Sequence, residues 1–107
     1  MILSNIEDIP NMQIVEHYGL VSGSTVRAKN FVKDFGAGVK NFFGGELKTY
    51  SDLLNESRME ATSRMVAQAE KLGANAIINI RFATSAVTAG AAEIYVYGTA
   101  VNAQPLA

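Results

Sequence analysis

Few residue types in this chain could carry catalytic or metal chemistry. It has no cysteine and a single histidine, His17. This composition excludes disulfides, thiolate metal sites, iron–sulfur clusters and cysteine nucleophiles. Serine hydrolysis or imidazole coordination would have to use His17. No nucleophile and base are paired in the sequence, so a non-catalytic protein is favoured over an enzyme.

Two further patterns could bind small ligands through other chemistry. The segment Phe35–Gly38 contains a Gly-x-Gly, but Asn41 stands where a dinucleotide fingerprint needs its third glycine. The acidic row Asp52, Glu56 and Glu60 has helical spacing and could ligate a hard cation. Carboxylates on one helix rarely converge without ligands from elsewhere, so a solvated helix face is the favoured interpretation. No cofactor is predicted.

Aromatic residues could form a binding platform or a protein contact. Tyr95 and Tyr97 lie two residues apart, which places them on one face of a predicted strand. With His17 and Arg81 on neighbouring strands, they make a mixed polar and aromatic surface. A subunit interface is the favoured interpretation; a solvated face and a ligand site remain alternatives.

Glu16 and Arg58 each break the pattern around them. Glu16 lies between Ile14 and Tyr18 on the predicted core face of a strand, and Arg58 falls inside the apolar stripe of a predicted helix. Their charges are complementary, which suggests a buried or half-buried ion pair, within one subunit or across an interface. The alternative is that Glu16 is solvated and Arg58 reaches another partner.

The elements that must position these residues are predicted from periodicity and turn residues. Residues 1–12 are expected to form an irregular arm. Strands are expected at 13–22, 75–86 and 92–102, and helices at 30–43 and 49–72. The second helix would be about 36 Å long and would end at Gly73. The order β-α-α-β-β predicts an α+β fold, with a three-stranded antiparallel sheet on one long helix.

Strand alternation separates an expected core face from an outer one. The core candidates are the even-numbered residues Ile14, Glu16, Tyr18, Leu20, Ile78, Ile80, Phe82, Ile94, Val96, Gly98 and Ala100. On the helix the apolar stripe contains Leu54, Ala61, Met65, Ala69 and Leu72. The long helix and the two uncovered sheet edges predict a closed oligomer rather than a monomer.

Composition places the chain among single globular domains. Its 107 residues suffice for one core, assigned to residues 1–107, and 49% of them are hydrophobic. A net charge of -1 gives no support to binding of nucleic acid or of an anionic membrane. Without an apparent export signal or a long apolar run, a cytoplasmic location is expected.

A set of short motifs, in order along almost the whole chain, is similar to a known family. The motifs are Val15-Glu16 with Ser22-Gly23, Asp34-Phe35 with Ala37-Gly38, Gly44-Gly45, Tyr50, Arg58, Leu72 to Ala76, and Gly98 to Val101. Together they resemble the YbjQ family, which is labelled as heavy-metal-binding and is of unknown function. The resemblance implies a subunit fold like that of dodecins and assembly as a homopentamer.

The resemblance leaves several functions open. Heavy metals favour thiolate and imidazole ligands, so only a symmetric ring of His17 residues could justify the metal label; an ordinary surface or interface histidine is the favoured alternative. Flavin stacking of the dodecin type relies on a tryptophan, and this chain has none. A non-catalytic oligomer that binds an unidentified small ligand or ion between subunits is therefore expected. The alternatives are a small enzyme with an intersubunit site and a metal-binding protein.

Overall fold

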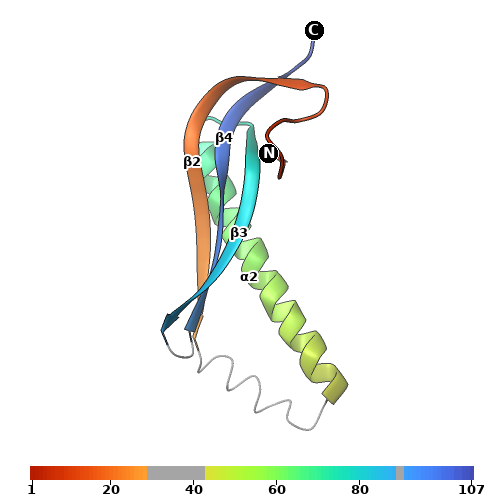
Figure 1. Cartoon of the computed structure of the whole chain (residues 1–107), viewed down its shortest axis with the longest axis vertical. Helices are drawn as coiled ribbons and strands as arrows, with labels where there is room; N and C mark the ends of the chain where they lie inside the picture. Colours follow the sequence, from red (N-terminus) through yellow and green to blue (C-terminus); the bar gives the residue numbers. More distant parts are fainter. Residues whose placement is uncertain (29–42, 89–90) are drawn as a thin grey trace.

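A computed structural model of the chain describes residues 1–28, 43–88 and 91–107. Its elements are β1 (Ile2–Leu3), β2 (Met12–Ala28), α2 (Phe43–Lys71), β3 (Ala76–Thr88) and β4 (Ala91–Pro105). The strands form one sheet in the order β1-β3-β4-β2, and α2 lies on one side of it (Figure 1). The α+β class is confirmed. The helix predicted at 30–43 falls almost wholly outside the described residues.

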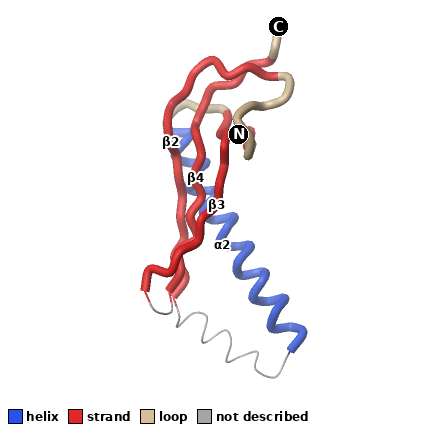
Figure 2. Tube along the Cα trace, in the orientation of Figure 1, coloured by secondary structure: helices blue, strands red, loops and turns tan. Residues whose placement is uncertain are grey.

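The three long strands pair as the sequence predicts. β4 is the central strand, antiparallel to both β2 and β3. β2 and β4 extend further than predicted at both ends and β3 at its C-terminal end, and β2 and β4 curve strongly near the chain termini (Figure 2). β-branched and aromatic residues fill their central parts, which suits a pleated, half-buried surface.

The N-terminal arm corrects the predicted strand count. Ile2 and Leu3 form β1, which pairs in parallel with the start of β3. Backbone hydrogen bonds continue this contact, from the Ser4 N–H to the Ile77 carbonyl at 2.9 Å and from the Asn79 N–H to the Ile6 carbonyl at 3.0 Å. The sheet is therefore four-stranded and mixed, rather than three-stranded and antiparallel.

Helix α2 presents a narrow stripe of small residues to the sheet. Among the α2 side chains that the structure describes, the buried ones are Ser57, Ala61, Met65 and Ala69, four residues apart, so they line one side of the helix. Ala61, Met65 and Ala69 are core as predicted, but Leu72 is exposed. The helix diverges from the sheet toward its N-terminal end (Figure 1).

The predicted glycine stop of this helix is confirmed. Gly73 has a φ of 86°. Its N–H donates to the Glu70 carbonyl at 3.0 Å, and the Ala74 N–H donates to the Ala69 carbonyl at 3.1 Å. These two bonds satisfy carbonyls at the helix end that would otherwise lack donors, and the left-handed conformation favours glycine.

The helix and sheet meet at a glycine. A side-chain carbon added to Gly23 of β2 would lie 2.1 Å from the Ala61 carbonyl oxygen and 2.7 Å from the Met65 backbone nitrogen. Around this contact, Val21, Ile77, Val96 and Ala100 pack against the buried helix residues. Small side chains on both elements therefore allow the close approach that closes the core.

A second, smaller core lies at the end of the sheet near the termini. Ile9 from the arm packs with four buried residues of β3 and β4, which are Ala76, Ile78, Val101 and Ala103. Because the arm covers this part of the sheet, Ile77 and Ile78 are both buried although they point to opposite faces.

The structure corrects the predicted core face of β2. The register between β2 and β4 shifts between Ile14 and Glu16 and again between His17 and Gly19. Each bulge adds a residue to one strand, so the side that faces the core changes. Ile14 and Tyr18 are half-buried, Glu16 and Leu20 are exposed, and the core residues are instead Val21, Gly23 and Thr25. On β4 the predicted face is confirmed, since Ile94, Val96, Gly98 and Ala100 are buried.

Asn75 joins the turn after α2 to the end of β4. Its side-chain Nδ2 donates to the Ala103 carbonyl, and the Ala103 N–H donates to its Oδ1, both at 2.8 Å. The amide thus satisfies both backbone groups of a buried residue, as a neighbouring strand would.

Asn75→Ala is expected to lower the free energy of unfolding by about 1–3 kcal/mol, because both backbone groups of Ala103 lose their partner. Asn75→Asp should also destabilise, since an oxygen would face the Ala103 carbonyl. Urea unfolding at a fixed protein concentration measures the change. Gln104→Ala, at an exposed position on the same strand, is the control and should change little; equal effects of both substitutions would contradict the role of the amide.

Among the described residues, no helix combines the length and the apolar character that crossing a membrane requires.

Candidate functional site

The sheet has one side that α2 does not cover, here called the outer face. On β4 it carries Tyr95, Tyr97 and Thr99, which alternate with the core residues facing α2. The two tyrosine rings are stacked, with centroids 5.5 Å apart and planes at 29°. They are half-buried by each other and by the neighbouring strands. The predicted pairing of these tyrosines on one face is therefore present in the structure.

Residues of the adjacent strands complete the outer face around the tyrosines. Arg81 of β3 lies directly opposite Tyr97, and Leu20 of β2 lies opposite Thr99. The Arg81 Nη1 donates to the Asn5 carbonyl at 2.6 Å and to the Ile80 carbonyl at 3.0 Å, so the guanidinium fastens the arm to the sheet. Leu20 is 69% exposed. The outer face thus combines a tethered cation with aromatic and apolar surface.

His17 lies on the same side of the sheet but away from the tyrosines. It pairs with Val101, four residues along β4 from Tyr97, and is exposed. Four strand residues span about 13 Å. Within one chain the structure therefore brings Arg81, Tyr95 and Tyr97 together and leaves His17 outside the group.

Glu16 and Arg58 do not pair within the described chain. Glu16 accepts a hydrogen bond from Tyr18, which with burial and the carboxylate charge raises the pKa of Tyr18. The Arg58 Nη1 donates to Asn55 Oδ1 at 3.1 Å. Both Glu16 and Arg58 are exposed, which corrects their placement on core faces. Glu16 lies opposite Asn102, two residues beyond the core residue Ala100 on β4, and Arg58 follows the buried Ser57. Pairing across a subunit boundary stays a prediction.

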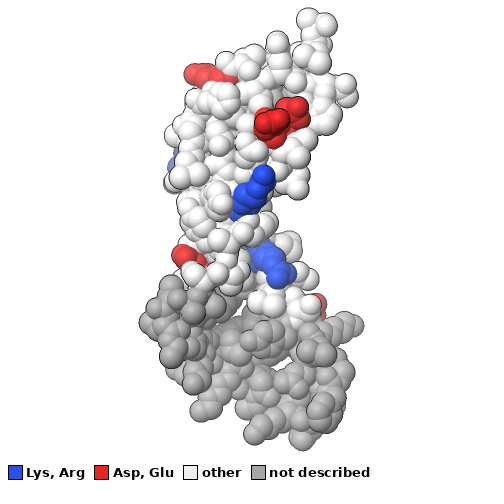
Figure 3. All heavy atoms as spheres, viewed as in Figure 1, with Lys and Arg blue, Asp and Glu red and all other residues white. Residues whose placement is uncertain are grey.

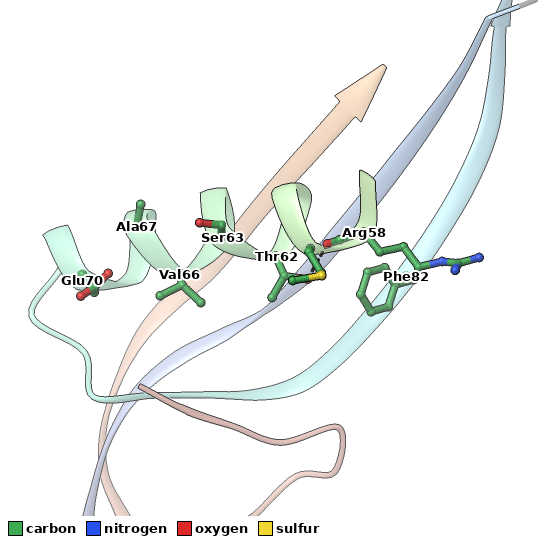
Figure 4. A pocket seen from close by; sticks show the side chains of 8 residues that line it. Arg58, Thr62, Ser63, Val66, Ala67, Glu70 and Phe82 are labelled. Carbon is green, nitrogen blue, oxygen red and sulfur yellow. Dashed lines mark hydrogen bonds between the residues drawn. The ribbon is translucent and has the colours of Figure 1, made fainter. Parts of the chain in front are cut away.

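A groove separates α2 from β3, because the helix packs mainly on β2 and β4 and barely contacts β3. Its volume is about 610 Å³. Its lining consists of Arg58, Met59, Thr62, Ser63, Val66, Ala67, Glu70 and Phe82. Phe82 points toward the helix side from β3, and Arg58 extends beside its ring (Figure 4). This surface is here called the α2–β3 groove.

The groove was not predicted from the sequence, which placed Phe82 on the core face. The Phe82 side chain is 52% exposed, because α2 packs mainly on β2 and β4 and contacts β3 little. Met59 of α2 is 72% exposed. The sequence did contain a signal for the position of Met59. Ser57, Ala61 and Ala69 recur at helical spacing and predict a buried stripe of small residues that does not include Met59.

Side chains of α2 form hydrogen bonds with backbone groups at the free edge of β2. The Ser22 N–H donates to Gln68 Oε1 at 2.7 Å, and Arg64 Nη1 donates to the Ser24 carbonyl. The Arg64 Nη2 also pairs with Glu60 Oε1 at 2.6 Å. Capping of edge backbone groups by side chains opposes addition of another strand there.

The described residues offer no metal cluster or catalytic arrangement. Nowhere in the described ranges do three or more His, Asp or Glu side chains converge as metal ligands would. Asp52, Glu56 and Glu60 are exposed along α2, as the solvated-face interpretation predicts. Most of the described surface in one view is uncharged (Figure 3).

Comparison with known proteins gives consistent relatives. A family model described as "Putative heavy-metal-binding", named YbjQ_1, matches residues 1–104. A UPF0145 protein of Hahella chejuensis is 59% identical, with 94% of this chain and 97% of that protein covered. Another, from Archaeoglobus fulgidus, is 50% identical over 95% and 94% of the two chains. A third, from Psychrobacter arcticus, is 55% identical, and the match spans 97% of this chain but 66% of that longer protein.

A solved structure supports the same fold at low identity. It is a protein of unknown function from Pediococcus pentosaceus, assigned to the DUF74 family, with a TM-score of 0.64 and 14% identity over 97% of this chain. That likeness concerns the fold alone. The family match over nearly all residues and the high identity to the curated relatives confirm the resemblance seen in the sequence, and the chain belongs to the YbjQ family of UPF0145 proteins.

Proposed function

We propose that this chain is a subunit of a non-catalytic, cytoplasmic homo-oligomer, a pentamer as the family resemblance implies, whose outer face forms contacts between subunits. The observation that supports this is the stacked Tyr95–Tyr97 pair beside the exposed Leu20, on a sheet face that no described helix covers. Aromatic residues with an arginine and little charge are typical of interface centres. A small ligand or ion would be held where such subunits meet.

The size of the exposed surface supports assembly. The chain exposes 6947 Å², whereas about 5,800 Å² is expected for a monomer of this mass. The excess is on the order of the 800 Å² that each partner buries in a stable interface. The radius of gyration is 17.3 Å, against about 13 Å for a compact domain of this length. An elongated subunit with excess surface is expected to bury part of it against copies of itself.

Native mass spectrometry of freshly purified protein tests the proposal. We expect five copies of the chain in one complex, with any co-purified ligand detected as added mass. Sedimentation at micromolar concentration should give the same subunit number. A monomer in both measurements would contradict the proposed function.

The family is described as heavy-metal-binding, but one chain offers few of the side chains that usually bind heavy metals. The sequence lacks cysteine, and the described residues hold no cluster of His, Asp and Glu suited to a metal. Soft metals bind weakly to isolated carboxylates. We therefore expect that neither zinc nor copper is retained, whether at one ion per subunit or at one ion per oligomer, after dialysis against a weak chelator, as measured by elemental analysis. Retained metal that His17→Ala abolishes would instead show a ring of histidines.

A further inference from the structure

The proposed oligomer, on which this inference rests, needs more than one contact surface per subunit. In a closed ring with cyclic symmetry beyond a dimer, each subunit uses one surface toward the next subunit and a different surface toward the previous one. The outer face can supply one of them. A ring then needs a second surface that receives the outer face, and the described residues offer one candidate.

The most exposed large apolar side chains identify two separate surfaces. Within the described ranges these are Met59 at 72% and Leu20 at 69%. Leu20 lies on the outer face, and Met59 lies in the α2–β3 groove with Phe82. Because α2 and the sheet stand between them, a single partner surface cannot cover both side chains.

The groove has the shape and composition of a receiving surface. It is shallow and open, and its helix wall contains small side chains, Thr62, Ser63 and Ala67, which let another element approach closely. Val66 and Phe82 supply apolar area on the two walls (Figure 4). The capped edge of β2 is a poor alternative, because Gln68 and Arg64 already bind its backbone groups.

The two surfaces also carry compatible charges. The groove has Arg58 at one end of its helix wall and Glu70 at the other. The outer face has Arg81 beside Tyr97 and Glu93 two residues before Tyr95. Each surface therefore has one base and one acid, so in one relative orientation the two surfaces do not set like charges against each other.

We infer that the α2–β3 groove is the second assembly surface of this protein, and that its occupant is the outer face of a neighbouring copy of the same chain. Met59 and Phe82 of one subunit then contact the Leu20 and tyrosine surface of the next. The contact is repeated around the ring until it closes.

Two single variants and their mixture test this pairing. Met59→Glu places a charge in the groove and leaves the outer face intact, whereas Leu20→Glu does the opposite. Both positions are exposed in the subunit, so the fold should tolerate the charge, and circular dichroism checks it. Ala67→Glu is a second groove variant. Met59→Leu and Leu106→Glu are controls that should keep the wild-type subunit number.

Native mass spectrometry gives a distinct result for each case. We expect Met59→Glu, Ala67→Glu and Leu20→Glu each to be monomeric when alone. An equimolar mixture of Met59→Glu and Leu20→Glu should form a dimer with one chain of each, because only one intact groove and one intact outer face can meet. Three results would overturn the inference without contradicting the proposed oligomer. They are the absence of this mixed dimer, dissociation of the Leu106→Glu control, and an unchanged oligomer in Met59→Glu. A monomeric wild type would overturn the proposed function itself.

Discussion

Gly23→Ala is expected to lower the free energy of unfolding by about 3 kcal/mol, at the upper end of the cost of overpacking. The new methyl carbon would lie 2.1 Å from the Ala61 carbonyl oxygen and 2.7 Å from the Met65 nitrogen. Both atoms belong to the helix backbone, so no side-chain rotation relieves the overlap. The helix must move away from β2, which opens the core.

Urea unfolding, followed by circular dichroism at one protein concentration, measures this effect. Ser24→Ala is the matched control, because it changes the next residue of β2 on the opposite side of the strand and should stay within about 0.5 kcal/mol. Gly23→Val should cost more than Gly23→Ala, since it adds further atoms against the same backbone. A Gly23→Ala protein as stable as the Ser24→Ala protein would show that α2 does not approach β2 this closely.

Met65→Ala is expected to lower the free energy of unfolding by about 3–4 kcal/mol, within the range measured for removing large buried side chains. Met65 is fully buried in the main core, where it contacts a cluster that includes Val21, Ile77 and Val96. The other described buried positions of α2 are Ser57, Ala61 and Ala69, whose small side chains cannot fill the space. A cavity between helix and sheet results.

The near-isosteric Met65→Leu separates volume from shape. It keeps most of the apolar volume and should cost less than about 1.5 kcal/mol. Thermal and urea unfolding of the two variants at equal concentration should therefore rank wild type, Met65→Leu and Met65→Ala in decreasing stability. Equal losses for Leu and Ala would mean that the thioether, rather than filled volume, holds this contact.

Local signals in the sequence determined the helix, its end and the three long strands. The apolar spacing of Ala61, Met65 and Ala69 follows the helical repeat, and the left-handed conformation at Gly73 follows from the chemistry of glycine. The stacked position of Tyr95 and Tyr97 followed from strand alternation. Each of these features depends on residues close together in the chain, so periodicity and residue type were sufficient.

The fourth strand and the core face of β2 were decided by tertiary contacts. β1 has two residues, too few for any periodic pattern, and exists because β3 offers free backbone groups. The bulges near Glu16 and His17 exist only in the register with β4, yet they decide which side of β2 is buried. A single inserted residue exchanges the two faces of a strand, and sequence alternation alone does not contain that information.

The candidate surfaces divide in the same way. The sequence predicted the tyrosines, Arg81 and His17 as one surface, and the structure unites all of these except His17. The groove exists because α2 packs mainly on β2 and β4, which leaves Phe82 of β3 and Met59 of α2 exposed. Where a helix lies across a sheet is set by which residues let the two backbones approach, here Gly23 against Ala61, and that choice depends on contacts between segments far apart in the chain.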